Sequence, residues 1–208
     1  MKKIIMPAVL MMCILFVVSN VYARNYQHCM DEGYEAKNMC DNDKAFECFE
    51  EALKYKNEDP VAMFHIGKIY EERGDVRKAS EYYEKVIAIS YHPLMTYEIG
   101  AFYLKIGDLN RAEEIYSRAL RHRVNLVEAN LGMADYNFAI KNYDKAIEFY
   151  QFVVERDQKR AIAFYRYAMC LEAVGKDDEA LEMCEKAMRI ENSEDIRKYY
   201  KHLKNKKR

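Results

Sequence analysis

The chemically reactive side chains of this 208-residue chain are scattered and do not form motifs. The five histidines share no spacing typical of a nucleophile–base pair or a zinc site: His28, His65, His92, His122 and His202. The sequence contains neither a glycine-rich phosphate loop nor a C-x-x-C pair. Acid pairs such as Glu71-Glu72 are typical of solvated helix faces. The sequence therefore predicts a protein that is not an enzyme and that needs no metal or cofactor.

Composition points to long helices. The chain has only seven glycines and three prolines, whereas turn-rich β architectures need many of both. Its 33 basic and 34 acidic residues give a net charge of −1, so we expect no nucleic-acid partner.

The N-terminal segment has the order of a secretory signal peptide. Lys2 and Lys3 form a positive start, Ile4 to Val18 are apolar, and Val21-Tyr22-Ala23 offers small residues where a signal peptidase cleaves. We expect residues 1–23 to be a signal peptide and the protein to be exported, either to a bacterial-type periplasm or as a secreted protein. The alternative is an uncleaved single-pass anchor, the only case in which we expect membrane contact.

One self-similar segment recurs five times, and each copy contains an alanine at the same place. Spacings of 34, 33, 34 and 34 residues separate these alanines: Ala45, Ala79, Ala112, Ala146 and Ala180. A bulky residue follows each alanine by four positions and a small or branched one by seven, as Tyr116 and Ala119 follow Ala112. Residues at i, i+4 and i+7 share one face of an α-helix, so the pattern predicts five helices with one packed stripe each.

A second helical segment precedes each of these helices, and a turn signal separates the two. The turns read Gly74-Asp75, Gly107-Asp108, Lys141-Asn142 and Gly175-Lys176. Glycine suits the left-handed end of a helix and asparagine is next best, so we expect Asn142 to take that conformation in the fourth copy. Gly67 and Gly100 are predicted to face Ala79 and Ala112 where paired helices cross closely.

These residues resemble the tetratricopeptide repeat (TPR) family. That family has Leu-Gly at repeat positions 7–8, Tyr at 11, Ala at 20 and an aromatic residue at 24, and the second copy carries Ile66-Gly67, Tyr70, Ala79 and Tyr83 there. The resemblance implies an all-α, right-handed α-solenoid of about five helical hairpins. We expect repeats near residues 26–59, 60–92, 93–126, 127–160 and 161–194, within an array over 24–194.

A last amphipathic segment follows the array. Ile196, Tyr199, Tyr200 and Leu203 lie at i, i+3, i+4 and i+7. One apolar side and one basic side suit a helix that caps an open solenoid end, so residues 195–208 are expected to form a capping helix and a basic tail.

The resemblance implies a concave groove lined by the first helix of each hairpin. The lining residues it implies are rich in aromatic side chains and methionine: Met30, Tyr34, Phe64, Lys68, Tyr97, Leu104, Leu131, Asp135, Phe138, Tyr165 and Met169. Such side chains are enriched at recognition surfaces, which favours a groove for an extended or helical protein segment. The alternative is that superhelical packing buries several of them.

The expected role is a protein-binding scaffold or adaptor whose partner is a protein or peptide segment. The carboxylate clamp of chaperone-binding relatives needs a lysine at repeat position 5, and here that position is never lysine: Met30, Phe64, Tyr97, Leu131 and Tyr165. Rival roles are a membrane-anchored subunit of an envelope assembly or secretion machine, and an accessory protein for an enzyme encoded elsewhere. Neither the partner nor the oligomeric state follows from the sequence.

Export places the cysteines in a compartment where disulfides persist. Cys170 and Cys184 fall on opposite helices of the fifth hairpin, where a disulfide is geometrically conceivable. Two buried free thiols are the alternative. Cys29 with Cys48 is a second candidate pair.

The signal-peptide prediction is checked by sequencing the N-terminus of the protein purified from its natural source. Cleavage gives a chain that begins at Arg24. A chain that keeps Lys2 and Lys3 is the result expected of the anchored alternative.

Overall fold

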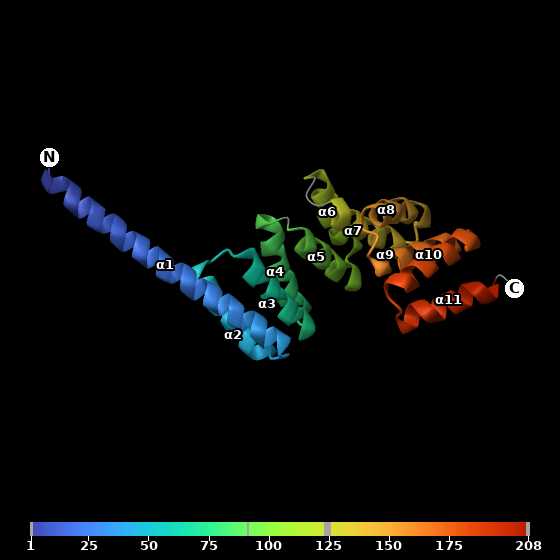
Figure 1. The fold of residues 1–208 in the computed structure, drawn as a ribbon, viewed down its shortest axis with the longest axis horizontal. Helices are drawn as coiled ribbons and strands as arrows, with labels where there is room; N and C mark the ends of the chain where they lie inside the picture. The colour runs from blue at the N-terminus through green and yellow to red at the C-terminus, as the bar shows by residue number, and fades with distance from the viewer. Residues whose placement is uncertain (1, 91, 123–125, 207–208) are drawn as a thin grey trace. The chain divides into compact units, whose positions relative to one another are not determined.

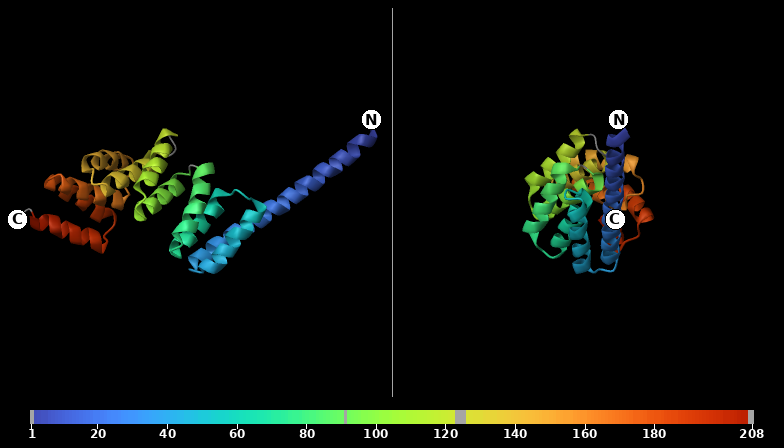
Figure 2. Two further views of the ribbon diagram at one scale, coloured as in Figure 1. Left: turned by 180° about the vertical axis from the view of Figure 1, so that it is seen from behind. Right: turned by 90° about the vertical axis from the view of Figure 1, so that its left-hand side faces the viewer.

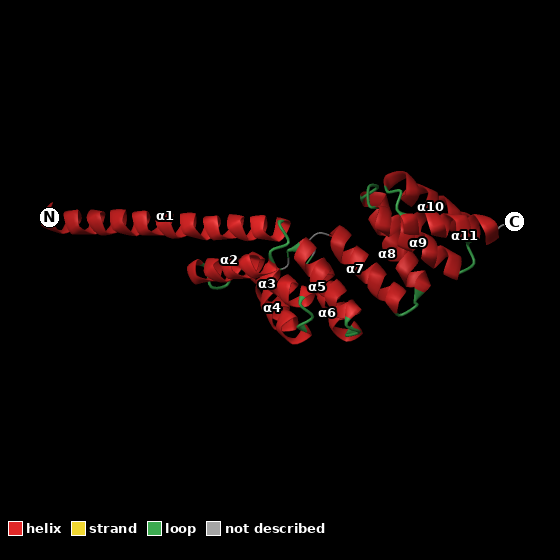
Figure 3. Ribbon diagram, turned by 90° about the horizontal axis from the view of Figure 1, so that it is seen from below, coloured by secondary structure: helices red, strands yellow, loops and turns green. Residues whose placement is uncertain are grey.

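A computed structural model describes residues 2–90, 92–122 and 126–206, apart from the side chains of residues 2–10, 12–15, 17–18 and 126. Every regular element in these ranges is an α-helix, and no strand occurs among them (Figures 1 and 3). The helices are α1 (Lys2–Asn38), α2 (Asn42–Tyr55), α3 (Pro60–Glu72), α4 (Val76–Ile89), α5 (Pro93–Lys105), α6 (Leu109–Arg121), α7 (Leu126–Ala139), α8 (Tyr143–Arg156), α9 (Ala161–Ala173), α10 (Asp177–Ile190) and α11 (Glu194–Lys206).

The chain forms two units, residues 1–90 and 91–208. The first unit contains the hairpins α1–α2 and α3–α4, and the second contains α5–α6, α7–α8 and α9–α10. The predicted all-α architecture of helical hairpins is confirmed. Helix α1 runs without a break through residue 23 and extends well past α2 (Figure 2). Among the residues that the structure describes, no helix has the length and apolar character needed to cross a membrane.

The alanines that reveal the repeat lie at the centres of the hairpins. Each is fully buried: Ala45, Ala79, Ala112, Ala146 and Ala180. The bulky residue four positions later is buried beside it, as in Phe49, Tyr83, Tyr116 and Tyr150. The i, i+4, i+7 stripe is therefore the inner face of each second helix.

A ring and a glycine meet where the paired helices approach closely. A Cβ added to Gly100 of α5 would lie 2.3 Å from the ring of Tyr116 in α6, and one added to Gly132 of α7 would lie 2.2 Å from the same ring. Gly67 stands in the same relation to Tyr83. The atoms nearest to these glycines thus belong to the aromatic residue four positions after each alanine, and its ring fills the space.

All five hairpin turns contain one residue in the left-handed region, at φ between 59° and 84°. The residues recur at the repeat period: Cys40, Gly74, Gly107, Lys141 and Gly175. In the fourth turn Lys141 takes this conformation, and Asn142 is instead the N-cap residue that precedes α8, so the expectation for Asn142 was wrong. The next amide closes the turn each time, as when Asn142 N donates to Asn137 O at 2.8 Å.

Cys170 and Cys184 are both buried and both free. The Cys184 thiol donates to the carbonyl of Ile196 at a sulfur–oxygen distance of 3.8 Å. Burial raises the pKa of Cys170 to about 12 and that of Cys184 to about 11, which keeps both as neutral thiols at physiological pH. Since both are free, the fifth hairpin holds the two buried thiols of the alternative and not the conceivable disulfide. Cys29 and Cys48 are free as well.

Helix α11 packs on α10 as the predicted cap. Ile196 and Leu203 are buried, and the Tyr199 hydroxyl donates to Glu172 of α9 at 2.8 Å. Lys206 pairs with Asp177 at 2.8 Å. The end of the basic tail, residues 207–208, lies outside the described residues.

An imidazole is packed among rings in the first unit. His65 of α3 stacks on Phe49 with ring centroids 4.9 Å apart and meets the edge of Tyr34 at 5.1 Å. Burial, with help from the positive charges of Lys37 and Lys68, lowers the pKa of His65 to about 4. The folded protein therefore holds this residue neutral.

This packing predicts a pH-dependent stability. The folded pKa of His65 lies below that of the unfolded chain, so the unfolded state binds the extra proton and the free energy of unfolding falls as pH drops from about 6.5 to about 4. We expect a loss on the order of 2 kcal/mol in urea unfolding followed by circular dichroism. A His65→Phe variant keeps the ring packing and should lose most of this dependence. An unchanged slope in that variant would contradict the assignment.

Candidate functional site

Four of the seven predicted groove residues of the second unit line one cavity, which we call the Tyr97 cavity. It has a volume of about 210 Å³ and is lined by Tyr97, Ala101, Leu104, Asp135, Phe138 and Arg166. These residues come from α5, α7 and α9, the first helices of three successive hairpins. Tyr97, Ala101 and Leu104 lie at i, i+4 and i+7, so they share one face of α5.

A buried carboxylate organises the polar end of the cavity. Asp135 is only 6% exposed. Its Oδ2 accepts a hydrogen bond from the Tyr97 hydroxyl at 2.9 Å and pairs with Arg166 Nη1 at 2.5 Å. Its Oδ1 accepts from the Tyr150 hydroxyl at 2.5 Å. The carboxylate is thus held by three donors from α5, α8 and α9, which satisfies the requirement for a buried charge.

The ionisation of the neighbouring groups follows from the same geometry. Burial and the negative charge of Asp135 raise the pKa of Tyr97 and of Tyr150 above the ordinary tyrosine value. Burial alone lowers the pKa of Arg166, but the adjacent carboxylate outweighs it and the pKa is raised. The tyrosines remain donors and the arginine remains a cation at physiological pH.

Arg166 combines a fixed position with access to the cavity. Its side chain is 34% exposed although it pairs with Asp135. A guanidinium has five N–H donors, so some remain for a partner's carbonyl or carboxylate. The cavity therefore offers apolar walls from Leu104 and Phe138 and a fixed cation at one end.

Several other predicted groove residues are interior packing residues. Met30, Phe64 and Leu131 are 3%, 6% and 1% exposed. Their assignment to a groove surface is corrected, because packing between helices uses them and leaves them no surface to offer. Asp135 is equally buried but reaches the Tyr97 cavity.

The remaining predicted residues lie at or near the surface with other contacts. Tyr34 is 37% exposed and packs edge-on against Phe49. Lys68 is half-buried and lies 3.7 Å from Glu71. Tyr165 meets the edge of Tyr199 in the capping helix at 5.4 Å, and Met169 is half-buried.

Sequence reasoning missed Arg166. It stands at repeat position 6, beside the positions that the resemblance assigns to the groove. One signal was available: Arg166 is the only basic residue in α9, a helix that is otherwise mostly apolar. Among the described residues, no group of His, Cys, Asp and Glu is arranged to hold a metal ion.

Comparison with known proteins gives a consistent picture. Residues 67–191 match the family model of the cilia and flagella-associated protein 70 middle TPR-like domain, and residues 30–93 match that of the tetratricopeptide repeat. A TPR repeat-containing protein of Methanocaldococcus jannaschii is 27% identical over 163 residues, which are 74% of this chain. The match spans only 29% of that relative's length.

Solved structures share the fold at low sequence identity. PilF of Pseudomonas aeruginosa is 12% identical with a TM-score of 0.74, and the match covers 81% of this chain and 78% of that one. MamA is 22% identical with a TM-score of 0.63, over 82% and 93% of the two chains. YrrB, described as a TPR protein with an unusual peptide-binding site, is 20% identical with a TM-score of 0.61, over 84% and 90%.

The carboxylate network makes a stability prediction. Asp135→Ala should lower the free energy of unfolding by about 3 kcal/mol, because it leaves Arg166 and two tyrosine hydroxyls without their acceptor. Urea unfolding of the purified chain measures this. The double variant Asp135→Ala with Arg166→Met should recover part of the loss, since it removes the unpaired charge. Equal stability of the single and double variants would show that the ion pair does not organise the site.

Proposed function

Because the chain belongs to the tetratricopeptide repeat family, we propose that it is a non-enzymatic scaffold whose Tyr97 cavity anchors a segment of a partner protein. The family relation supports a protein-binding adaptor. We further propose that the binding site lies on the faces of α5, α7 and α9 around Arg166.

The observation that carries this proposal is the composition of the cavity. At about 210 Å³ it is smaller than the roughly 300–1,000 Å³ typical of small-molecule sites, so it suits one side chain of a longer segment. Apolar walls beside a fixed guanidinium can hold that side chain and pair with a nearby carbonyl or carboxylate. The peptide-binding site described for YrrB supports the same use of this fold.

We also propose that the scaffold works after export, in the periplasm or outside the cell. The support is the sequence of residues 1–23, with Lys2 and Lys3 before the apolar run. The uncleaved, membrane-anchored form remains the rival, and the identity of the mature N-terminus separates the two.

Filling the cavity with a larger side chain tests this proposal. A photoreactive residue at Leu104 identifies the contacted segment in an extract of the natural source, and a synthetic peptide of that segment is then titrated by fluorescence anisotropy. Ala101→Trp should lower the affinity for the peptide at least about tenfold, because the indole occupies the cavity.

Ile106→Trp is the matched control, since this residue is 39% exposed and lies outside the cavity. It should leave binding and the melting curve unchanged. An Ala101→Trp protein that stays folded and binds the peptide with full affinity would refute the proposal.

A further inference from the structure

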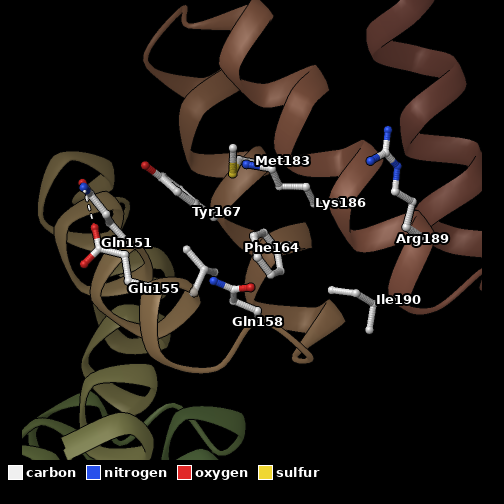
Figure 4. A pocket seen from close by; sticks show the side chains of 10 residues that line it. Gln151, Glu155, Gln158, Phe164, Tyr167, Met183, Lys186, Arg189 and Ile190 are labelled. Atoms are coloured by element: carbon white, nitrogen blue, oxygen red, sulfur yellow. Dashed lines mark hydrogen bonds between the residues drawn. The ribbon is translucent and has the colours of Figure 1, made fainter.

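A second, larger cavity opens among α8, α9 and α10, and we call it the α8–α10 pocket. Its volume is about 580 Å³, and it shares no residue with the Tyr97 cavity. Figure 4 shows Phe164 at its centre, with Tyr167 and Met183 beside it and Ile190 at the edge. Phe164 and Tyr167 are largely buried, whereas Ile190 is 39% exposed. The pocket therefore has an apolar floor that is open to solvent.

Charges on the rim are unevenly satisfied. Glu155 accepts from the Gln151 side chain at 3.0 Å and lies 3.8 Å from Arg156. Lys186 pairs with Glu182 at 2.7 Å. Arg189 is exposed, and among the described acids none forms an ion pair with it. Glu155 has partners within the protein, whereas no described acid pairs with Arg189. The rim therefore has a cation that can pair with a negative charge on a partner.

The same pocket occurs in the first unit at equivalent positions of another repeat. A cavity of about 520 Å³ there includes seven residues that each precede their counterparts by 101 positions: Leu53, Asn57, Met63, Tyr82, Lys85, Ala88 and Ile89. The counterparts are Val154, Gln158, Phe164, Met183, Lys186, Arg189 and Ile190. Lys85 lies 4.9 Å from the centre of the Tyr82 ring, and no described acid pairs with it. Apolar floor, amide, lysine and exposed isoleucine thus recur together.

This combination is not a general property of the repeat. At the position of the exposed isoleucine, the two intervening repeats carry His122 and Arg156. At the position of the lysine they carry Arg118 and Phe152. The two pockets therefore share a chemistry that the sequence supplies only in the second and fifth repeats.

We propose that the α8–α10 pocket docks a helical segment of a partner protein: one apolar side chain and the helix turn that carries it occupy the about 580 Å³, which is more than a single side chain needs. An Asp or Glu within one turn of that side chain pairs with Arg189. The pocket of the first unit is a weaker copy, because Ala88 stands where the second unit has Arg189. A nucleic acid or anionic lipid fits poorly, since two cations beside an apolar floor leave little for phosphates and the whole chain is slightly negative.

The test uses the full chain and an array of helical peptides of about 12 residues, roughly three turns. Each carries one Leu, Ile, Met or Phe and an Asp or Glu three or four residues later, and a parallel array carries Lys in place of the acid. We expect binding to the acidic array alone. The best peptide is titrated by calorimetry, with two peptides per chain expected, one of them weaker.

Two rim variants locate the binding. Arg189→Glu and Ile190→Glu should each weaken the tighter site at least about tenfold, and Arg189→Glu should gain affinity for the Lys version of the peptide. Ile106→Glu is the matched control, because Ile106 and Ile190 have the same 39% exposure and Ile106 lies outside the pocket. It should bind as the unchanged protein does.

Several results would overturn the proposal: no peptide bound, equal binding of acidic and Lys arrays, or binding that survives both rim variants. Tighter binding to a single-stranded oligonucleotide or to anionic vesicles, lost with Arg189→Glu, would also overturn it. Ala101→Trp should not affect the acidic peptide, which keeps this test independent of the Tyr97 cavity.

Discussion

The insertion of an aromatic ring into a glycine gap is the constraint on which the second unit depends. The Tyr116 ring is fully buried against Gly100 of α5 and Gly132 of α7, at distances that leave no room for a Cβ. Its hydroxyl donates to the carbonyl of Tyr97 at 3.1 Å. One side chain of α6 thus sets how closely α5 and α7 approach. Because protein interiors are close-packed, the separation of these two helices can change little.

The Tyr97 cavity follows from that approach. Tyr97 on α5 reaches Asp135 on α7 only because the two helices lie close, and Arg166 of α9 closes the same network from the next hairpin. The burial of Asp135 fixes the arginine in turn, since an unpaired carboxylate there would be costly. The Tyr97 cavity is therefore built from the packing of three hairpins, and each contributes a first helix.

Much of this could be predicted from the sequence, because helical periodicity and a 34-residue repeat are local signals. The buried alanines, the second-helix rings and the capping helix lie where those signals place them. Burial of the first-helix residues could not be predicted in the same way. Leu131 and Asp135 are one turn apart and both buried, yet only Asp135 lines the Tyr97 cavity, which depends on how neighbouring helices pack. Lys141 likewise takes a backbone conformation that its residue type does not favour, because the repeat geometry requires it.

The length of α1 sets how far this helix extends past the hairpin that it forms with α2. The Tyr22 ring packs edge-on against Tyr55, the last residue of α2. The part of α1 before Tyr22, about 20 residues, therefore continues beyond that hairpin. At a rise of 1.5 Å per residue they span about 30 Å. The start of α1 therefore lies about that far from the end of its contact with α2. An α1 that began at Arg24 would nearly match α2 in length, so residues 2–23 set how far this helix extends and not how the hairpins are built.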